Sequence, residues 1–366
     1  MAENSKMQSE LEELTKEYSK TKYNKATNKY LGKLRAKIAN IKKSMATKST
    51  KKGIGFAIRK SGDATVALVG FPNAGKSSLL TRITDAESKI ANYAFTTLEV
   101  IPGMMHHKGA KIQVFDLPGL IRGAHLGKGG GTQIASAMRS ADLILFVIDC
   151  SSTEDLFILL EELDELGIKV GVERPNIKIE RRLNGGIRIE EGRHKTPDKQ
   201  IVTKILNEFG IFHADVVFHT DTTDDDILDY LSMGNVYINA MVALNKVDLN
   251  KDYEKVCETI RKKSGFHTIP ISVTTGFHVQ ELKDMLFNEL GLIRIYLKPK
   301  DGAPDYVRPM IMHSGNTVVD VARKLHSKVG DDLKAAYVSG KSVKFLNQKV
   351  GKGHVLKDED IITLIY

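Results

Sequence analysis

The chain has 366 residues, a formal net charge of +9, and 42% apolar and 27% charged residues, a length and composition that predict two to four domains with hydrophobic cores. Its two cysteines, Cys150 and Cys257, exclude a disulfide framework and a cysteine-based metal site, so we expect both thiols to be free and buried. No apolar run reaches the length of a membrane span, and Met1–Ser5 lacks a signal-peptide pattern. We therefore expect a cytoplasmic protein.

Positive charge is concentrated near the N-terminus. Between Tyr18 and Lys60 the chain has 14 Lys or Arg and no Asp or Glu, so by difference the remainder has a net charge of −5. Ser9 and Glu12 form an N-cap pattern for a first helix, and residues with helical spacing predict a second one: Leu31, Leu34, Ile38, Ile41 and Met45. We expect a helical hairpin whose basic face binds RNA phosphates. An ordinary solvated face is the alternative.

A phosphate-binding motif follows the first predicted strand. The apolar run Ala64–Val69 predicts a buried strand, and Ser78–Ile83 predicts a helix. Between them lies G-x-x-x-x-G-K-S, the P-loop pattern, whose backbone N–H groups surround phosphates at the helix N-terminus. We expect Lys76 to reach the β- and γ-phosphates and Ser77 to bind Mg²⁺. The predicted nucleotide contacts here are Gly70, Phe71, Pro72, Asn73, Ala74, Gly75, Lys76, Ser77 and Ser78.

Two segments further along have the pattern of γ-phosphate sensors. Thr97, rather than its neighbour Thr96, is expected to complete the Mg²⁺ shell when a triphosphate is bound, although two adjacent threonines can also be an edge-strand pair. Asp116 follows the strand-like run 110–115 and begins D-x-x-G. We expect Asp116 to hold Mg²⁺ through a water and the Gly119 N–H to contact the γ-phosphate.

The catalytic apparatus has a gap after D-x-x-G. Many enzymes with these motifs place a glutamine there to orient the attacking water, but this chain has Leu120. Asn73 in the P-loop is typical of sites that bind K⁺, which would stabilise charge developing on the phosphates. The alternative is that Asn73 only shapes the loop. The segment Gly123–Gly131, with five glycines in nine residues, is predicted to be a mobile switch, and its His125 receives no role.

The next elements are interrupted by an insertion. Leu143–Asp149 predicts a core strand and Thr153–Leu166 a helix. Inside the insertion we expect a hairpin of strands 177–180 and 186–189 around Asn184-Gly185, and helices at 199–209 and 225–233. Asp224, Asp225 and Asp226 are read as an acidic first helical turn rather than a metal site.

A base-reading motif follows the apolar run 240–244. Asp248 of the sequence Asn-Lys-Val-Asp can accept two hydrogen bonds from guanine, whose ring N–H and exocyclic amine are adjacent, whereas adenine lacks that pair. Asn245 is expected to hold the loop and contact the purine, and the Lys246 stem to cover one face of it. In the run Ile269–Gly276, we expect Ser272 and Val273 to contact the base, with a backbone N–H near Val273 donating to the guanine carbonyl. The motifs together predict GTP rather than ATP.

These motifs resemble the developmentally regulated GTP-binding (DRG) family, in the Obg-related branch of P-loop GTPases. The residues that carry the resemblance are Gly70–Ser78, Tyr93–Leu98, Asp116–Ile121 with the Gly-rich tail, and Asn245–Asp248. It implies an α/β fold: a P-loop GTPase domain (61–166 and 240–291) with an inserted ribosomal-protein-like α/β domain (167–239), an N-terminal basic helical hairpin (1–60) and a C-terminal β-grasp or TGS domain (292–366). The last region fits that description, with a strand at 293–297, a helix from Thr317 to about Lys328, and three further strands.

The resemblance implies a slowly hydrolysing GTPase associated with ribosomes or ribosomal RNA. The motifs predict that it hydrolyses GTP to GDP with Mg²⁺, and Asn73 predicts that K⁺ stimulates it. A stabilising partner protein is a further expectation; no membrane contact or DNA specificity is indicated. The expected catalytic residues are Lys76, Asn73, Thr97 and Gly119, and the metal ligands Ser77, Thr97 and Asp116 for Mg²⁺ and Asn73 for K⁺. One alternative is an RNA or ribosome adaptor in which GTP is mainly structural. Another is a signalling switch unrelated to translation.

Overall fold

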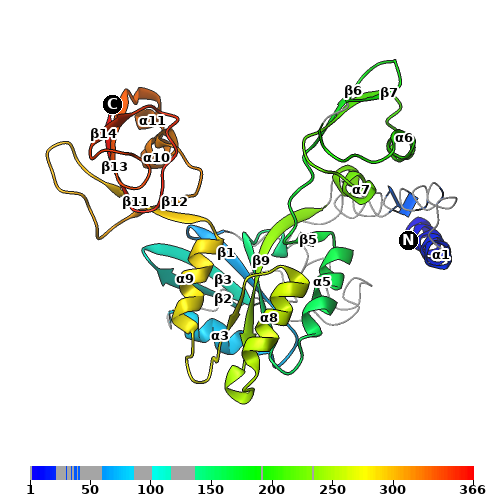
Figure 1. Cartoon of the computed structure of the whole chain (residues 1–366), viewed down its shortest axis with the longest axis horizontal. Coiled ribbons are helices and arrows are strands. Elements are labelled where there is room, and N and C mark those ends of the chain that lie inside the picture. Colours follow the sequence, from blue (N-terminus) through cyan, green and yellow to red (C-terminus); the bar gives the residue numbers. More distant parts are fainter. Residues whose placement is uncertain are drawn as a thin grey trace. The chain divides into compact units, whose positions relative to one another are not determined.

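The computed structural model describes residues 2–21, 30, 34, 37–38, 40–41, 60–85, 101–116, 137–190, 193–232 and 235–366. The chain divides into two compact units: one of Ala57–Leu166 with Ile238–Tyr366, the other of Met1–Phe56 with Gly167–Tyr237. Most of their elements are labelled in Figure 1.

The larger unit contains a mostly parallel sheet in the order β10-β9-β4-β1-β3-β2. Its strands are β1 (Ala64–Val69), β2 (Ile101–His107), β3 (Ala110–Asp116), β4 (Leu143–Asp149), β9 (Val236–Asn245) and β10 (Thr268–Pro270). Neighbouring strands are parallel except for the antiparallel pair β2–β3. The strands predicted at 64–69, 110–115 and 143–149 are confirmed, and the apolar run at 240–244 is the second half of β9.

Helices cover both faces of this sheet. One buried cluster joins the apolar sides of two helices to alternate strand residues such as Val66 and Leu68. On the other face, the Phe146 ring of β4 stacks on Phe266, with centroids 6.1 Å apart. Because the inner strands are buried on both faces, they need apolar side chains at consecutive positions. The helices of this part are α3 (Lys76–Ile83), α5 (Asp155–Glu165), α8 (Tyr253–Ser264) and α9 (Val279–Glu289).

The parallel strands bring several chain segments to one edge of the sheet. Carboxyl ends of parallel strands meet at the same edge, and ligands of such folds bind in the crevice there. The ends of β1, β3, β4, β9 and β10 and the segments after them therefore converge. They include the P-loop, Asp116 at the end of β3 and Asn245 at the end of β9.

The C-terminal region of the same unit is a second sheet in the order β12-β11-β15-β13-β14, with its own buried cluster. A capping box starts its helix α10: the Thr317 N–H and hydroxyl each donate to Asp320 Oδ2 at 2.7 Å. The helix ends at Leu325, earlier than predicted, because the backbone of His326 is extended (φ −167°, ψ 141°), and a second helix follows it. The elements are β11 (Leu292–Leu297), β12 (Met310–His313), α10 (Val318–Leu325), α11 (Ser327–Asp332), β13 (Ala335–Ser339), β14 (Gln348–Val350) and β15 (Asp360–Ile365).

The insertion forms a three-stranded sheet in the order β6-β8-β7, and the hairpin predicted between its first two strands is wrong. The missed strand β8 lies between them, antiparallel to β6 and parallel to β7. Its alternate residues Ala214, Val216 and Phe218 are buried in the local core, which explains why it takes the central position. The elements are β5 (Ile168–Val170), which pairs with β9, β6 (Ile177–Arg181), β7 (Ile187–Ile189), α6 (Lys199–Glu208), β8 (Ala214–Phe218) and α7 (Asp224–Ser232).

Both predicted helices of the insertion are confirmed, and the three aspartates form the first turn of α7. The Thr223 N–H donates to Asp226 Oδ2 at 2.7 Å, as expected at a helix start. Within the described ranges, no three His, Cys, Asp or Glu side chains are grouped as they would be around a metal ion.

At the N-terminus, α1 (Ala2–Lys20) runs through Ser9, so the predicted N-cap there is wrong. The residues before Ser9 include Glu, Lys, Met and Gln, which are good helix formers and extend the helix backwards. Of the predicted second helix, Leu34, Ile38 and Ile41 are described and helical, and Leu34 is buried. Both cysteines are free and buried. In the described part of the chain, no helix combines the length and apolarity needed to cross a membrane.

Candidate active site

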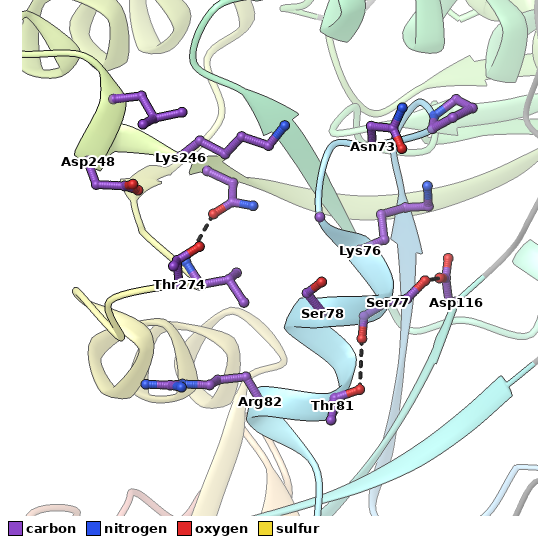
Figure 2. A pocket seen from close by; sticks show the side chains of 15 residues that line it. Asn73, Lys76, Ser77, Ser78, Thr81, Arg82, Asp116, Lys246, Asp248 and Thr274 are labelled. Atoms are coloured by element: carbon purple, nitrogen blue, oxygen red, sulfur yellow. Dashed lines mark hydrogen bonds between the residues drawn. The ribbon is translucent and has the colours of Figure 1, made fainter.

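An open cavity of about 1250 Å³ lies at the carboxyl edge of the main sheet (Figure 2). Four predicted motifs line it, through Pro72, Asn73, Gly75, Lys76, Ser77, Ser78, Asp116, Asn245, Lys246, Asp248 and Val273. Four further lining residues were not singled out from the sequence: Thr81, Arg82, Leu249 and Thr274. The remaining predicted contacts that the structure describes do not line the cavity: Gly70, Phe71, Ala74 and Ser272.

The backbone of the P-loop needs its glycines. Gly75 has φ +97°, and a Cβ atom there would lie 2.3 Å from Asn245 Nδ2. A Cβ atom on Gly70 would lie 2.3 Å from the carbonyl oxygen of Val147 on the neighbouring strand. Asn73 is also left-handed, with φ 65°, a conformation that asparagine tolerates better than most residues. The loop thus combines a left-handed turn with close approach to β4 and to Asn245.

The side chain of Asn245 joins two loops. Its Nδ2 donates to the Ala74 carbonyl at 2.9 Å, and its Oδ1 accepts from the Val273 N–H at 3.1 Å. The side chain is buried, so these bonds are shielded from water. This is the loop-holding role that the motif predicts. The Val273 amide, which lies in the segment predicted to contact the base, is thus already engaged by Asn245.

At the phosphate end, Lys76 Nζ donates to the Phe71 carbonyl at 3.2 Å. Burial lowers the pKa of Lys76, and the charge of Asp116 partly opposes that shift. The Ser77 hydroxyl donates to Asp116 Oδ2 at 2.7 Å, while Asp116 Oδ1 is buried with no hydrogen-bond partner in the described part of the chain. A hydroxyl beside a carboxylate that has an unused oxygen is a donor set suited to a hard cation such as Mg²⁺.

At the base end, Lys246 and Asp248 project from the loop after β9, across the cavity from α3 (Figure 2). Lys246 is left-handed, with φ 63°, and its ammonium lies 2.7 Å from Asp149 Oδ2. Asp248 belongs to a short 3-10 helix, Val247–Leu249, and is exposed. The neighbouring Leu249 is 77% exposed, an unusual state for a leucine that lines a cavity.

Comparisons with known proteins agree with this geometry. Residues 65–180 match the family model of a 50S ribosome-binding GTPase, residues 184–292 match the C-terminal region of that domain, and residues 293–366 match the TGS domain. The chain is 37% identical to a developmentally regulated GTP-binding protein 2 homolog of Dictyostelium discoideum, over 97% of this chain and 98% of that protein. It is 38% identical to developmentally regulated GTP-binding protein 1 of Xenopus laevis, over 96% and 97%. An uncharacterized GTP-binding protein of Methanocaldococcus jannaschii is 41% identical, over 98% and 93%.

The chain belongs to the developmentally regulated GTP-binding protein family. This DRG-family protein is therefore a GTP-binding protein and a GTPase, with a P-loop GTPase domain and a C-terminal TGS domain. The predicted family and fold class are confirmed.

Two residues that the sequence did not single out belong to α3 of the DRG-family protein. Thr81 and Arg82 follow Ser78 by three and four positions, so they share its helix face toward the cavity. Their helical spacing from the P-loop was the available signal. Leu249 and Thr274 each directly follow a predicted contact. The predicted sensors Thr97 and Gly119, together with Thr96, Leu120 and the Gly123–Gly131 segment, lie outside the described residues.

The Gly75→Ala substitution tests the close approach of the P-loop to Asn245. The added methyl group meets Asn245 Nδ2, so we expect the tie between the two loops to break. The free energy of unfolding should fall by about 3 kcal/mol, the sum of left-handed strain and a broken buried hydrogen bond. Urea unfolding measures the stability, and titration with a fluorescent GDP analogue measures the expected loss of binding.

Gly265→Ala is the matched control. Gly265 ends α8 with φ +74° but has no atom within 4 Å of its would-be Cβ. The Gly265→Ala substitution should therefore lower the free energy of unfolding by the left-handed strain alone, about 1 kcal/mol, and leave GDP binding intact. Equal losses of stability in the two variants, with binding retained in both, would contradict the role of Gly75.

Proposed function

We propose that this GTPase reads guanine through Asp248, holds Mg²⁺ through Ser77 and Asp116, uses K⁺ bound at Asn73, and acts on the ribosome. One observation carries the nucleotide assignment. A single cavity has the P-loop lysine at one end and the Asp248 carboxylate at the other, with Asn245 joining the loops beneath.

For the base, we assign three contacts. The Asp248 carboxylate accepts from the ring N–H and the exocyclic amine of guanine. The stem of Lys246 covers one face of the purine, and the exposed Leu249 adds apolar surface beside it. Thr274, which lines the cavity next to the engaged Val273, supplies the backbone N–H for the guanine carbonyl.

For the phosphates, the loop amides and Lys76 bind the β- and γ-phosphates. Ser77 and Asp116 hold Mg²⁺, and the predicted sensors Thr97 and Gly119 add a metal ligand and a γ-phosphate contact. When bound, Mg²⁺ supplies electrostatic stabilisation of the charge that develops on the phosphate oxygens. Lys76 contributes in the same way, because its partly buried ammonium gains the negative charge of the triphosphate as a partner.

The potassium proposal rests on Asn73. It lines the cavity in a left-handed conformation and is exposed, which suits a side chain that contacts a ligand rather than the core. Because Leu120 cannot orient water, a monovalent cation held by Asn73 would add the missing charge stabilisation.

The ribosome proposal has three supports. The matching family model is described as a 50S ribosome-binding GTPase, and the chain has a TGS domain. The acid-free segment from Tyr18 to Lys60 has a charge of +14, suited to RNA phosphates. We place the protein in the cytoplasm as a ribosome- or ribosomal-RNA-binding factor, assisted by a stabilising partner protein.

Asp248→Asn tests the base assignment. The amide offers one donor and one acceptor, so guanine loses its paired acceptors while xanthine, which has a carbonyl in place of the amine, gains a donor. We expect GTP affinity to fall by about 3 kcal/mol or more, roughly a hundredfold, and xanthosine triphosphate to bind more tightly than GTP. Competition binding with both nucleotides measures this. Unchanged guanine preference would remove Asp248 from the base site.

Asn73→Ala tests the potassium site. We expect turnover in potassium chloride to fall about a hundredfold, to the rate seen in sodium chloride, because charge stabilisation at the phosphates is lost. Phosphate release at saturating GTP in the two salts is the measurement. Asn347→Ala is the control, since Asn347 is also left-handed (φ 55°) but lies in the TGS domain. Potassium stimulation that survives Asn73→Ala would overturn the assignment.

Co-sedimentation with ribosomes tests the proposed partner. The protein is loaded with a non-hydrolysable GTP analogue or with GDP and examined over a salt series. We expect stronger binding in the GTP state, weakening as salt rises because phosphate contacts release counterions. Equal binding in both states, lost steeply with salt, would favour the adaptor in which GTP is structural. No binding in either state would exclude the ribosome as partner.

A further inference from the structure

A carboxylate outside the nucleotide motifs holds the lysine of the base-reading loop. Asp149 ends β4, and its Oδ2 lies 2.7 Å from Lys246 Nζ. The two strands are in register, with Asp149 opposite Asn245, so the next residue of β9's loop lies beside the end of β4. In Figure 2 the Lys246 side chain extends from its loop toward the P-loop side of the cavity.

Asp149 is itself fixed. Its Oδ1 accepts from the Ser151 N–H at 2.9 Å and from the Ser151 hydroxyl at 2.7 Å, which leaves Oδ2 for the lysine. Burial raises the pKa of Asp149, but the hydrogen bonds from Lys246 and Ser151 outweigh it and hold the pKa below its usual value. The carboxylate therefore stays ionised and presents one oxygen at a defined place.

The main chain of the reading loop is fastened at the same point. The Cys150 N–H donates to the Asn245 carbonyl at 3.0 Å, and the Cys150 thiol donates to the Lys246 carbonyl at 3.1 Å. Lys246 has a left-handed backbone, which a residue with a Cβ atom adopts only when its surroundings hold it there. The end of β4 thus holds both the backbone and the side chain of Lys246.

The ion pair between Asp149 and Lys246 also affects the carboxylate of Asp248 on the same loop. Asp248 lies two residues beyond Lys246, and both line the cavity, Lys246 half-buried and Asp248 exposed. A lysine without Asp149 would have Asp248 as an alternative partner, and a carboxylate engaged by an ammonium is less available to guanine. The pairing with Asp149 draws the ammonium to the opposite side and leaves the Asp248 oxygens open.

We propose that Asp149 is a positioning residue for guanine recognition, which keeps the Lys246 stem extended as a wall for the purine and keeps its ammonium away from Asp248. This inference rests on the proposed assignment of Asp248 and Lys246 to the base. Asp149 does not line the cavity and acts through the lysine.

Asp149→Asn tests the proposal, since it preserves shape and the bonds from Ser151 but removes the charge that holds Lys246. We expect a fluorescent GDP analogue to dissociate about tenfold faster, a coupling typical of residues in one hydrogen-bond network. KM for GTP should rise by a similar factor, while kcat at saturating GTP stays within about twofold because no transition-state contact is lost. The ratio of the affinity for GDP to that for inosine diphosphate, which lacks the exocyclic amine, should become smaller.

Asp252→Asn is the matched control. Asp252 precedes α8 as its N-cap residue and pairs with the exposed Lys255 at 2.8 Å, and neither residue lines the cavity. It should leave dissociation, KM and base preference at their wild-type values. Thermal melting of each variant verifies the fold, and Ser151→Ala, which removes one donor to Asp149, should give a smaller change in the same direction if Asp149→Asn does not fold.

A double mutant separates positioning from a merely structural role. Lys246→Met retains an unbranched stem without the ammonium, so Asp149→Asn added to it should change GDP dissociation less than about twofold. A full additional effect in that background, or wild-type dissociation in Asp149→Asn, would overturn the proposal. Failure of the base site itself has a different signature, since Asp248→Asn would then keep its guanine preference whatever Asp149 does.

Discussion

The buried amide of Asn245 is the interaction on which the site depends. A parallel sheet brings strand ends to one edge, but it leaves the loops beyond them free to move independently. Asn245 removes that freedom by donating to the P-loop at Ala74 and accepting from the loop after β10 at Val273. The phosphate-binding and base-binding segments are thereby held at a fixed separation, which a ligand that spans both requires.

Charge in the cavity is arranged around the same frame. Lys76 is partly buried and has a lowered pKa, so it gains most when a polyanion arrives. Asp116 keeps one buried oxygen without a partner in the described chain, which a cation would satisfy. Lys246, by contrast, is already neutralised by Asp149. The charge of Lys246 is therefore compensated within the protein, whereas the charge of Lys76 is available to an anion that enters the cavity.

The sequence was most informative where local pattern and chemistry coincide. From Ala64 to Ile83 an apolar run is followed by glycines at positions where the backbone path of the loop requires them. The strand, the P-loop and the helix were all predicted from these features. The insertion shows the limit. Asn184-Gly185 has the local chemistry of a hairpin turn, yet β8, far along the chain, occupies the space between the two strands because its alternate residues form the core. Strand pairing is decided by burial between segments that are distant in sequence, and the local sequence of a turn does not contain that information. Asp149 was missed for the same reason: its partner Lys246 is distant in sequence, and only strand register brings them together.

The register of β4 and β9 also matters because an inserted domain separates these two strands along the chain. Adjacent strands β4 and β9 are separated by 86 residues of chain, between Asp149 and Val236, so no short loop fixes their alignment. Long connections cost little extra closure entropy, but they also exert little control over pairing. A slip of one residue would exchange the two faces of β9 and move Lys246 away from Asp149. Both strands are buried at nearly every position, so apolar burial does not distinguish one alignment from the next, and the Cys150 and Asp149 contacts at the strand ends select it. The contacts that position the base-reading loop thus also fix the register of β4 and β9. Because these contacts lie at the strand ends, the register does not depend on the chain that connects the two strands, and a domain can be inserted there.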